Sequence, residues 1–219
     1  DNSIRDIEAG SCGFDLAKDI GPGLAKDAVA IDINGEQRDL FDPINEDANV
    51  SIITINSEEG LEIMRHTLTA QVLARAIKTI YPDSQLAIGP TIKDGFYYDF
   101  KTNKTVSIDS LHDIEKEMKK IIDSKSNITK KLFSRKDALK VFNDNKEPYK
   151  KLIIEDSDQK NDFQLYFQDD NQFADLCRGP HLPNLSFIGS FKLTRVSGAY
   201  WKGDSKNEML TRIYGTAWT

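Results

Sequence analysis

The sequence predicts an α+β protein in two parts: a small α+β unit over residues 1–56 and a larger α+β domain over residues 57–219. Two patterns support this organisation. Asn34-Gly35 lies between two short apolar segments, which is a strong signal for a β-hairpin with a two-residue turn. Between Leu61 and Ala76, apolar residues recur at helical spacing. The second part is therefore expected to contain a long helix packed on a mainly antiparallel sheet.

The small unit is expected to begin with a helix that Ser11 caps and that runs to Ile20. The following Gly21-Pro22-Gly23 should end it. Strands are predicted on both sides of the hairpin turn and again before the junction at residues 57–60, over residues 29–33, 36–41 and 50–55.

The larger domain should open with the long helix, over residues 61–80, which Pro82 stops. A second helix is expected over residues 109–122, with acids at its start and lysines at its end, as the helix dipole favours. A third helix should begin after the capping residue Ser134. Strands are expected, all in one sheet, over residues 86–88, 96–100, 128–133, 163–167 and 187–193.

Composition limits the class of protein. An apolar content of 39% in 219 residues is enough for a folded core, and no run of about 18 apolar residues is present to span a membrane. No signal peptide is visible. The two cysteines, Cys12 and Cys177, lie far apart in the sequence, so a reduced, cytoplasmic protein is a simpler interpretation than a disulfide-bonded one.

The net charge of −6 argues against a protein that coats nucleic acid, but the charge is uneven. Residues 175–219 hold six Lys or Arg against three acidic residues, which leaves −9 on the remainder. A local basic surface on an acidic protein suits contact with a few phosphates of an RNA end. Ordinary surface scatter would also produce a segment of this charge.

The last third of the chain carries the most chemical information. In Asp175-Leu176-Cys177-Arg178-Gly179-Pro180-His181, a cysteine and a histidine stand four residues apart, and both are potential nucleophiles, bases or metal ligands. Further distinctive segments are Gly198-Ala199-Tyr200-Trp201-Lys202-Gly203, Arg212-Ile213-Tyr214-Gly215-Thr216, Gly89-Pro90, Gly95-Phe96-Tyr97-Tyr98-Asp99-Phe100 and Gly21-Pro22-Gly23-Leu24.

Taken in their order along the chain, these segments closely resemble the N-terminal region of the bacterial-type threonyl-tRNA synthetase family. The resemblance covers nearly the whole chain. It implies a ubiquitin-like (β-grasp) TGS domain over residues 1–56 and a tRNA editing domain over residues 57–219. The implied activity is hydrolysis of mischarged seryl-tRNA(Thr), with the acceptor end of tRNA(Thr) as partner.

The resemblance also implies what this part of such a protein lacks. ATP and zinc belong to the catalytic domain of the family, through which the full-length protein is expected to form a homodimer. The fragment is therefore expected to need no cofactor, not to form threonyl-adenylate and not to charge tRNA.

The resemblance implies an editing pocket lined by two histidines on the long helix, together with Cys177 and His181. The helix departs from this pattern, because the segment from His66 to Val72 is one residue longer than the family's. Aligned from the left, His66 is the first histidine and Ala70 replaces the second. Aligned from the right, Thr67 replaces the first and Gln71 the second.

The extra residue changes the phase of the helix. His66 and Gln71 are five residues apart, which is about 140° around a regular α-helix. They cannot share a face unless a π-bulge absorbs the extra residue. We therefore predict an irregularity between His66 and Gln71.

By the same resemblance, the catalytic candidates are His66, Lys150, Asp175 and His181. The candidates for substrate binding are Gln71, Tyr98, Cys177 and Arg178. Each has a plainer interpretation: Lys150 and Asp175 as a solvated pair, Tyr98 as a core aromatic, and His66 as a histidine on a helix face. Cys177 is interpreted as a pocket wall and not as a nucleophile.

No metal is predicted. A structural zinc site takes about four ligands, and the candidates are His66, Cys177 and His181, because His112 lies on a polar helix face. Two rival functions stay open. One is a degenerate editing domain that binds tRNA as a spacer without hydrolysis, which the altered helix favours. The other is a zinc-dependent, stand-alone editing protein.

Overall fold

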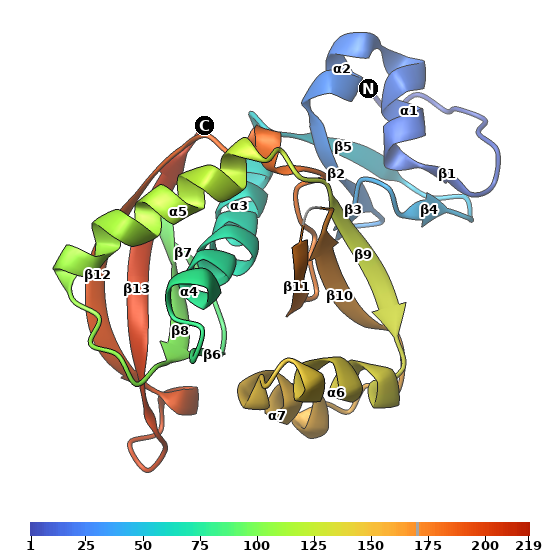
Figure 1. The fold of residues 1–219 in the computed structure, drawn as a ribbon. Helices are drawn as coiled ribbons and strands as arrows, with labels where there is room; N and C mark the ends of the chain where they lie inside the picture. Colours follow the sequence, from blue (N-terminus) through green and yellow to red (C-terminus); the bar gives the residue numbers. More distant parts are fainter. Residues whose placement is uncertain (170) are drawn as a thin grey trace. The chain divides into compact units, whose positions relative to one another are not determined.

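The computed structural model describes residues 1–169 and 171–219. The chain forms two compact units: a first unit of Asp1–Met64 and Gly179–Pro183, and a second unit of Arg65–Arg178 and Asn184–Thr219. Figure 1 shows the elements of both. Every strand pair in the described part of the chain is antiparallel.

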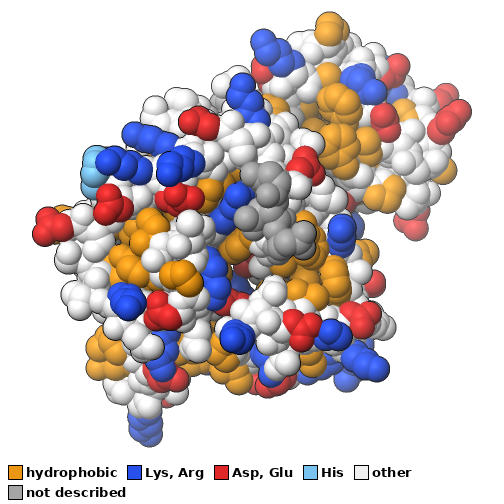
Figure 2. Space-filling view, in the orientation of Figure 1, with side chains coloured by type: hydrophobic (Ala, Val, Ile, Leu, Met, Phe, Trp, Pro, Cys, Tyr) orange, Lys and Arg blue, Asp and Glu red, His pale blue; other side chains and the backbone are white. Residues whose placement is uncertain are grey.

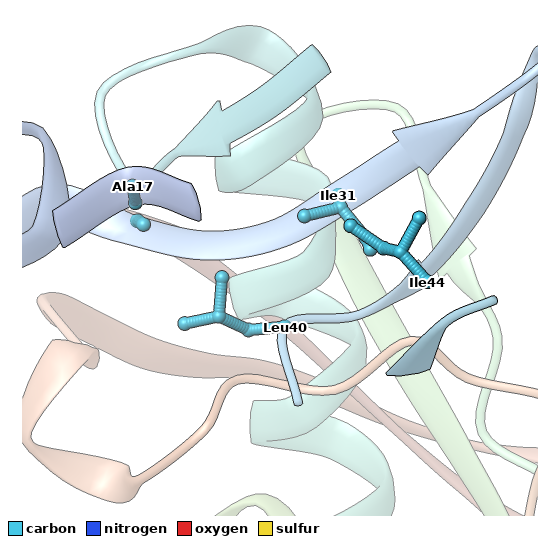
Figure 3. Packing of buried hydrophobic residues seen from close by; sticks show 5 residues of the cluster. Ala17, Ile31, Leu40 and Ile44 are labelled. Atoms are coloured by element: carbon cyan, nitrogen blue, oxygen red, sulfur yellow. The ribbon is translucent and has the colours of Figure 1, made fainter. Parts of the chain in front are cut away.

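The first unit packs two short helices on a small sheet. Its main sheet has three strands in the order β3-β2-β5, and β1 pairs with β4 beside it. The elements are β1 (Ser11–Cys12), α1 (Gly13–Ile20), α2 (Pro22–Asp27), β2 (Ala28–Ile33), β3 (Glu36–Asp39), β4 (Pro43–Ile44) and β5 (Val50–Thr54). The core is drawn in Figure 3 and consists of Ala17, Ala28, Ile31, Leu40 and Ile44.

The hairpin predicted from Asn34-Gly35 is confirmed. Strands β2 and β3 pair from Ile33 opposite Glu36, and both turn residues have positive φ, 52° and 87°, as this type of turn requires. The predicted cap of α1 is wrong by one residue. The helix starts after Cys12, whose main-chain N–H donates to the Asp15 carboxylate at 3.0 Å. The sequence analysis also missed the short helix α2.

Besides the predicted long helix, the described part of the second unit contains three α-helices and three short 3₁₀-helices. The long helix consists of α3 (Glu58–Thr67), which starts in the first unit, the π-helical segment η1 (Leu68–Leu73) and α4 (Ala74–Ile80). The other helices are η2 (Ile108–Ser110), α5 (Leu111–Asp123), α6 (Arg135–Asp144), α7 (Pro148–Asp156), η3 (Leu185–Phe187) and η4 (Trp201–Gly203).

Two antiparallel sheets complete the second unit. One has five strands, in the order β12-β13-β8-β6 with β7 also paired to β8, and the other has three, in the order β11-β10-β9. The strands are β6 (Gln85–Leu86), β7 (Thr91–Ile92), β8 (Gly95–Lys101), β9 (Ile128–Phe133), β10 (Phe163–Gln168), β11 (Asn171–Leu176), β12 (Ser190–Tyr200) and β13 (Met209–Trp218). The prediction that residues 163–167 and 187–193 share one sheet is therefore wrong, because β10 and β12 belong to different sheets.

The helices cover one face of the five-stranded sheet, as predicted. In Figure 1, α4 and α5 lie across β8, β13 and β12. Alternate residues of β8, namely Phe96, Tyr98 and Phe100, are fully buried, as expected of the strand face that meets the helices. On α5, Ile114 and Met118 are fully buried too.

The irregularity predicted in the long helix is confirmed as a π-helical turn. Over Leu68–Leu73 the helix widens, and the N–H of Ala74 donates to the carbonyl of Thr69, five residues back instead of four. All six residues are buried. The extra residue is therefore absorbed inside the helix, and α4 continues to Ile80 without a break.

Helices α6 and α7 pack on one face of the three-stranded sheet, against Phe163 and Leu165 of β10. The predicted cap of α6 is confirmed, since the Ser134 side chain accepts from the N–H of Asp137. The sequence analysis did not identify α7, although Pro148 at its first turn is a typical start signal.

The solvent face of α5 is basic. His112, Lys116, Lys119 and Lys120 are exposed, and Figure 2 shows blue side chains gathered over this helix. The polar environment expected for His112 is thus confirmed. Among the described residues, no helix is long and apolar enough to cross a membrane.

Candidate active site

A buried ion pair lies at the centre of the site. Lys150 lies in the first turn of α7 and Asp175 near the end of β11, and the Lys150 Nζ is 2.8 Å from the Asp175 Oδ1. The side chains are only 5% and 3% exposed. The alternative interpretation, a solvated surface pair, is therefore wrong. Two charges are removed from water together, which is costly unless they are well paired.

The charge state of Lys150 follows from its surroundings. Burial by itself lowers the pKa of Lys150, but attraction to Asp175 outweighs it, and the net pKa lies above the ordinary value for lysine. Lys150 is therefore cationic at neutral pH. It can bind an electron-rich oxygen, but it cannot accept a proton as a general base.

Tyr98 on β8 borders the pair. The Lys150 Nζ is 5.7 Å from the centre of the Tyr98 ring, within cation–π range. Burial raises the pKa of Tyr98, and the nearby Lys150 charge only partly opposes this. The Tyr98 hydroxyl is buried and has no well-oriented hydrogen-bond partner among the described residues. Tyr98 is thus a core residue that also forms a wall of the site, and its neutral hydroxyl can donate a hydrogen bond.

Gly89 allows Tyr98 to pack against the long helix. A Cβ at this position would lie 2.2 Å from Tyr98 Cδ2 and 2.8 Å from the Thr69 Oγ1. The Thr69 hydroxyl in turn donates to the carbonyl of Tyr97 at 2.8 Å, so the π segment is fastened to β8. Only glycine fits between these groups without displacing one of them.

His66 and Cys177 form the second contact of the site. The His66 Nε2 on α3 lies 2.8 Å from the Cys177 Sγ, just after β11. The main-chain N–H of Cys177 donates to the carbonyl of Gln164 on β10, which holds the cysteine at the strand end. Neither Cys12 nor Cys177 is joined in a disulfide, and the reduced state expected for both stays a prediction.

Gln71 makes the third contact. It lies in the π segment and is fully buried, and Gln168 of β10 donates to its side-chain oxygen at 3.0 Å. The π-bulge therefore lets His66 and Gln71 reach the same pair of strands. Gln168 was not among the residues that the sequence analysis selected, and a polar residue that ends an apolar strand was the available signal.

Six residues that the sequence predicted take part in these contacts of the second unit. Together we call them the polar cluster: His66, Gln71, Tyr98, Lys150, Asp175 and Cys177. A cavity of about 290 Å³ lies in the same unit, lined by other residues than these six. Each of three elements that carry the cluster also lines the cavity, through Arg75 on the helix, Glu147 at the start of α7 and Ala174 on β11.

Glu147 was also missed by the sequence analysis. Its Oε1 lies 2.6 Å from the Lys78 Nζ of α4, and its Oε2 accepts from the N–H of Leu86. Burial raises the pKa of Glu147, and the Lys78 charge opposes this. The ion pair links α4 to α7, the helix that carries Lys150, and so helps to fix the position of Lys150.

The remaining predicted residues are placed differently. Arg178 is exposed in the second unit. His181 belongs to the first unit, where its main-chain N–H donates to the Asp39 carboxylate at 2.9 Å. Of the residue types that bind zinc, the second unit places His66 and Cys177 together. The expectation that the chain binds no metal stays a prediction.

Comparisons with known families agree with the resemblance seen in the sequence. The family described as "Threonyl and Alanyl tRNA synthetase second additional domain" matches residues 164–214, and the TGS domain family matches residues 1–54. The first match includes Asp175 and Cys177 of the polar cluster.

Three similar curated proteins are threonine–tRNA ligases. That of Ehrlichia chaffeensis is 47% identical over 217 residues, which is 99% of this chain and 34% of the relative. That of Paramagnetospirillum magneticum is 48% identical over 220 residues, 100% of this chain and 34% of the relative. That of Acinetobacter baumannii is 46% identical over 205 residues, 94% of this chain and 32% of the relative.

The chain thus spans about a third of the length of the curated relatives it matches. Its fold is α+β, as predicted from the sequence. The chain thus matches the TGS domain family and the threonyl and alanyl tRNA synthetase second additional domain family, and over nearly its whole length it is similar to the N-terminal region of bacterial threonine–tRNA ligases.

Proposed function

We propose that this chain removes serine from mischarged tRNA(Thr) by hydrolysing the ester at the terminal adenosine. The observation that carries this proposal is the buried Lys150–Asp175 pair beside Tyr98. Burying two charges is costly, and such groups concentrate where a polar substrate must be bound and turned over.

Binding energetics explain why such a site is needed. A site that activates threonine must bind a hydroxyl, and serine offers the same hydroxyl. Serine lacks only one methyl group, which is worth about 1–3 kcal/mol. A second, smaller site that admits serine and excludes the methyl of threonine supplies the missing discrimination.

The residues are proposed to divide the work according to their charge state. Lys150 stays protonated and binds an oxygen of the terminal ribose or of the ester. Asp175 and His66 orient the attacking water, and the imidazole of His66 has a ring nitrogen that can accept a proton from it. For His181 a catalytic role is proposed from the resemblance alone. Tyr98 and Cys177 form walls, and Arg178 contacts a phosphate.

The partners follow from the same proposal. The substrate is the acceptor end of tRNA(Thr), in the cytoplasm. ATP, zinc and the homodimer contact are proposed to belong to the catalytic domain of the full-length protein.

A second candidate function has an observation in its favour. Gln71 stands in the π segment where the family has a histidine, and glutamine cannot take up a proton near neutral pH. A domain that binds tRNA and spaces its neighbours without hydrolysis would retain the fold and lose the base.

Deacylation of seryl-tRNA(Thr) by the full-length protein tests the two candidates. If the full-length protein hydrolyses seryl-tRNA(Thr) and Lys150→Met abolishes this hydrolysis, the result supports editing. Binding of tRNA(Thr) with no hydrolysis above the uncatalysed rate supports the spacer. Lys202→Met is the matched control, because Lys202 forms an exposed ion pair with Asp156.

A further inference from the structure

Three side chains form a directed chain of hydrogen bonds that ends at Gln71. The Arg75 Nη1 donates to the Gln168 Oε1 at 2.6 Å. The Gln168 Nε2 then donates to two oxygens of Gln71, its side-chain Oε1 and its main-chain carbonyl, both at 3.0 Å. Gln71 and Gln168 are 0% and 3% exposed, so water does not compete for these bonds.

Chemistry fixes the direction of this chain. The two ends of a glutamine amide look alike in a structure, and their assignment follows from the partners. Arg75 can only donate, so it must face the oxygen of Gln168. The main-chain carbonyl of Gln71 can only accept, so it must face the nitrogen of Gln168. Both constraints orient Gln168 in the same way.

The orientation of Gln71 follows. Since Gln168 offers it an N–H, Gln71 must present its Oε1 to Gln168 and its NH₂ in the other direction. The Nε2 of Gln71 is buried and has no hydrogen-bond partner among the described residues. A buried donor without a partner is costly, at about 1–3 kcal/mol, and calls for an acceptor that binds there.

The register of the three-stranded sheet places this donor on the face of the sheet that carries Asp175. Tyr166 of β10 lies directly opposite Asp175 of β11, and Gln168 is two residues further along β10. The pairing of β10 with β9 is regular across this stretch, so Tyr166 and Gln168 point to the same face. Gln71, held by Gln168, thus lies on the face of the sheet that carries Asp175.

Ester hydrolysis has one oxygen that needs such a donor. Water forms a bond to the seryl carbonyl carbon, and the carbonyl electron pair moves onto its oxygen. The pair then returns, the bond to the ribose oxygen breaks, and the proton lost by water ends on the ribose. Donors aimed at the transient negative oxygen are among the strongest catalytic groups.

We propose that Gln71 donates its side-chain N–H to the carbonyl oxygen of the ester, with Gln168 as the residue that positions it. Gln71 neither gains nor loses a proton in this role, so a glutamine performs it at any pH. The inference rests on the proposed editing function and gives Gln71 an electrophilic role in place of a basic one.

Deacylation of seryl-tRNA(Thr) by the full-length protein tests the donor. Gln71→Met keeps the length of the side chain and removes the N–H, and we expect kcat to fall about 10²–10³-fold with KM little changed. Gln168→Glu leaves Gln71 in place but cannot donate to it. The amide of Gln71 should then turn its NH₂ to the new carboxylate, and kcat should fall comparably. Gln159→Glu, at an exposed glutamine, is the matched control and should be neutral.

If the wild type hydrolyses seryl-tRNA(Thr) and Gln71→Met does so with the same kcat, the donor role of Gln71 is wrong and the editing function still stands. If the wild type itself does not hydrolyse seryl-tRNA(Thr), the editing function fails, and a second measurement decides on the donor. The probe is 3′-seryl-aminoadenosine, in which an amide replaces the ester. We expect it to shift the side-chain NH₂ resonance of Gln71, assigned by its loss in Gln71→Glu. An unchanged resonance at saturating probe would overturn the donor.

Discussion

The ammonium group of Lys150 lies 2.8 Å from the carboxylate of Asp175, and both side chains are almost completely removed from water. Removing one partner leaves an uncompensated buried charge. Lys150→Met should therefore destabilise the chain by about 3–5 kcal/mol, measured by denaturant unfolding. Lys202→Met removes a partner from the exposed pair with Asp156 and should shift the midpoint little.

The double variant Lys150→Met/Asp175→Leu adds a check on this prediction. Because it removes both charges, it should be more stable than Lys150→Met alone. A double variant that is as unstable as the sum of the two single variants would show that the residues do not interact.

The same pair predicts a dependence of stability on pH. The folded pKa of Lys150 is raised above the unfolded value of about 10.4, so the folded state holds its proton more tightly. The stabilisation is complete below pH of about 10.4 and is lost as pH rises beyond it. The difference in unfolding free energy between wild type and Lys150→Met should shrink over that alkaline range. A difference that grows there would contradict the assignment.

Tyr98 should titrate abnormally. Burial raises its pKa, so its hydroxyl stays protonated in the folded chain at pH values where exposed tyrosines, with a pKa of about 10, ionise. Tyr98→Phe should leave the phenolate absorbance of the folded chain unchanged near pH 10 and lower it by one tyrosine after unfolding. A loss of phenolate absorbance in the folded variant near this pH would contradict the burial of Tyr98.

Local patterns account for the parts of the fold that the sequence predicted. The Asn34-Gly35 turn, the Ser134 cap and the spacing of apolar residues along the long helix are all signals within a few residues. The π segment was predictable because one extra residue between two matching segments must be absorbed somewhere. The assignment of β10 and β12 to one sheet failed because strand pairing is set by contacts distant in sequence.

Some residues of the site were predicted from the sequence and others were not. Lys150 and Asp175 were proposed from resemblance, and the ion pair between them agrees with that grouping. Gln168 and the link between Glu147 and Lys78 were not foreseen, because their importance lies in partners 97 and 69 residues away. A glutamine that ends an apolar strand was the available signal for Gln168, but it does not identify the distant partner.

Gly89→Ala should damage both packing and deacylation. The added methyl would meet the Tyr98 ring at 2.2 Å and the Thr69 hydroxyl at 2.8 Å, so one of them must move. Overpacking of this kind costs about 1–3 kcal/mol. Gly23→Ala is the control, because no atom lies within 4 Å of its Cβ position. Unfolding free energies and deacylation rates that are equal in the two variants would contradict the close packing at Gly89.

His66 and Cys177 touch but should contribute unequally to hydrolysis. If His66 orients or activates water, His66→Ala should lower kcat about 10²–10⁴-fold, as removal of a general base typically does. Cys177 is interpreted as a wall beside it, so Cys177→Ala should keep kcat within about one order of magnitude of wild type while changing KM.

The discriminating measurement is deacylation of seryl-tRNA(Thr) by both variants in the full-length protein, with threonyl-tRNA(Thr) as a second substrate. A wall residue excludes the larger amino acid, so Cys177→Ala should hydrolyse threonyl-tRNA(Thr) faster than wild type, and His66→Ala should not. The opposite result, a larger fall in kcat for Cys177→Ala than for His66→Ala, would assign the chemistry to the thiol. His66 would then be the residue that positions it across their 2.8 Å contact.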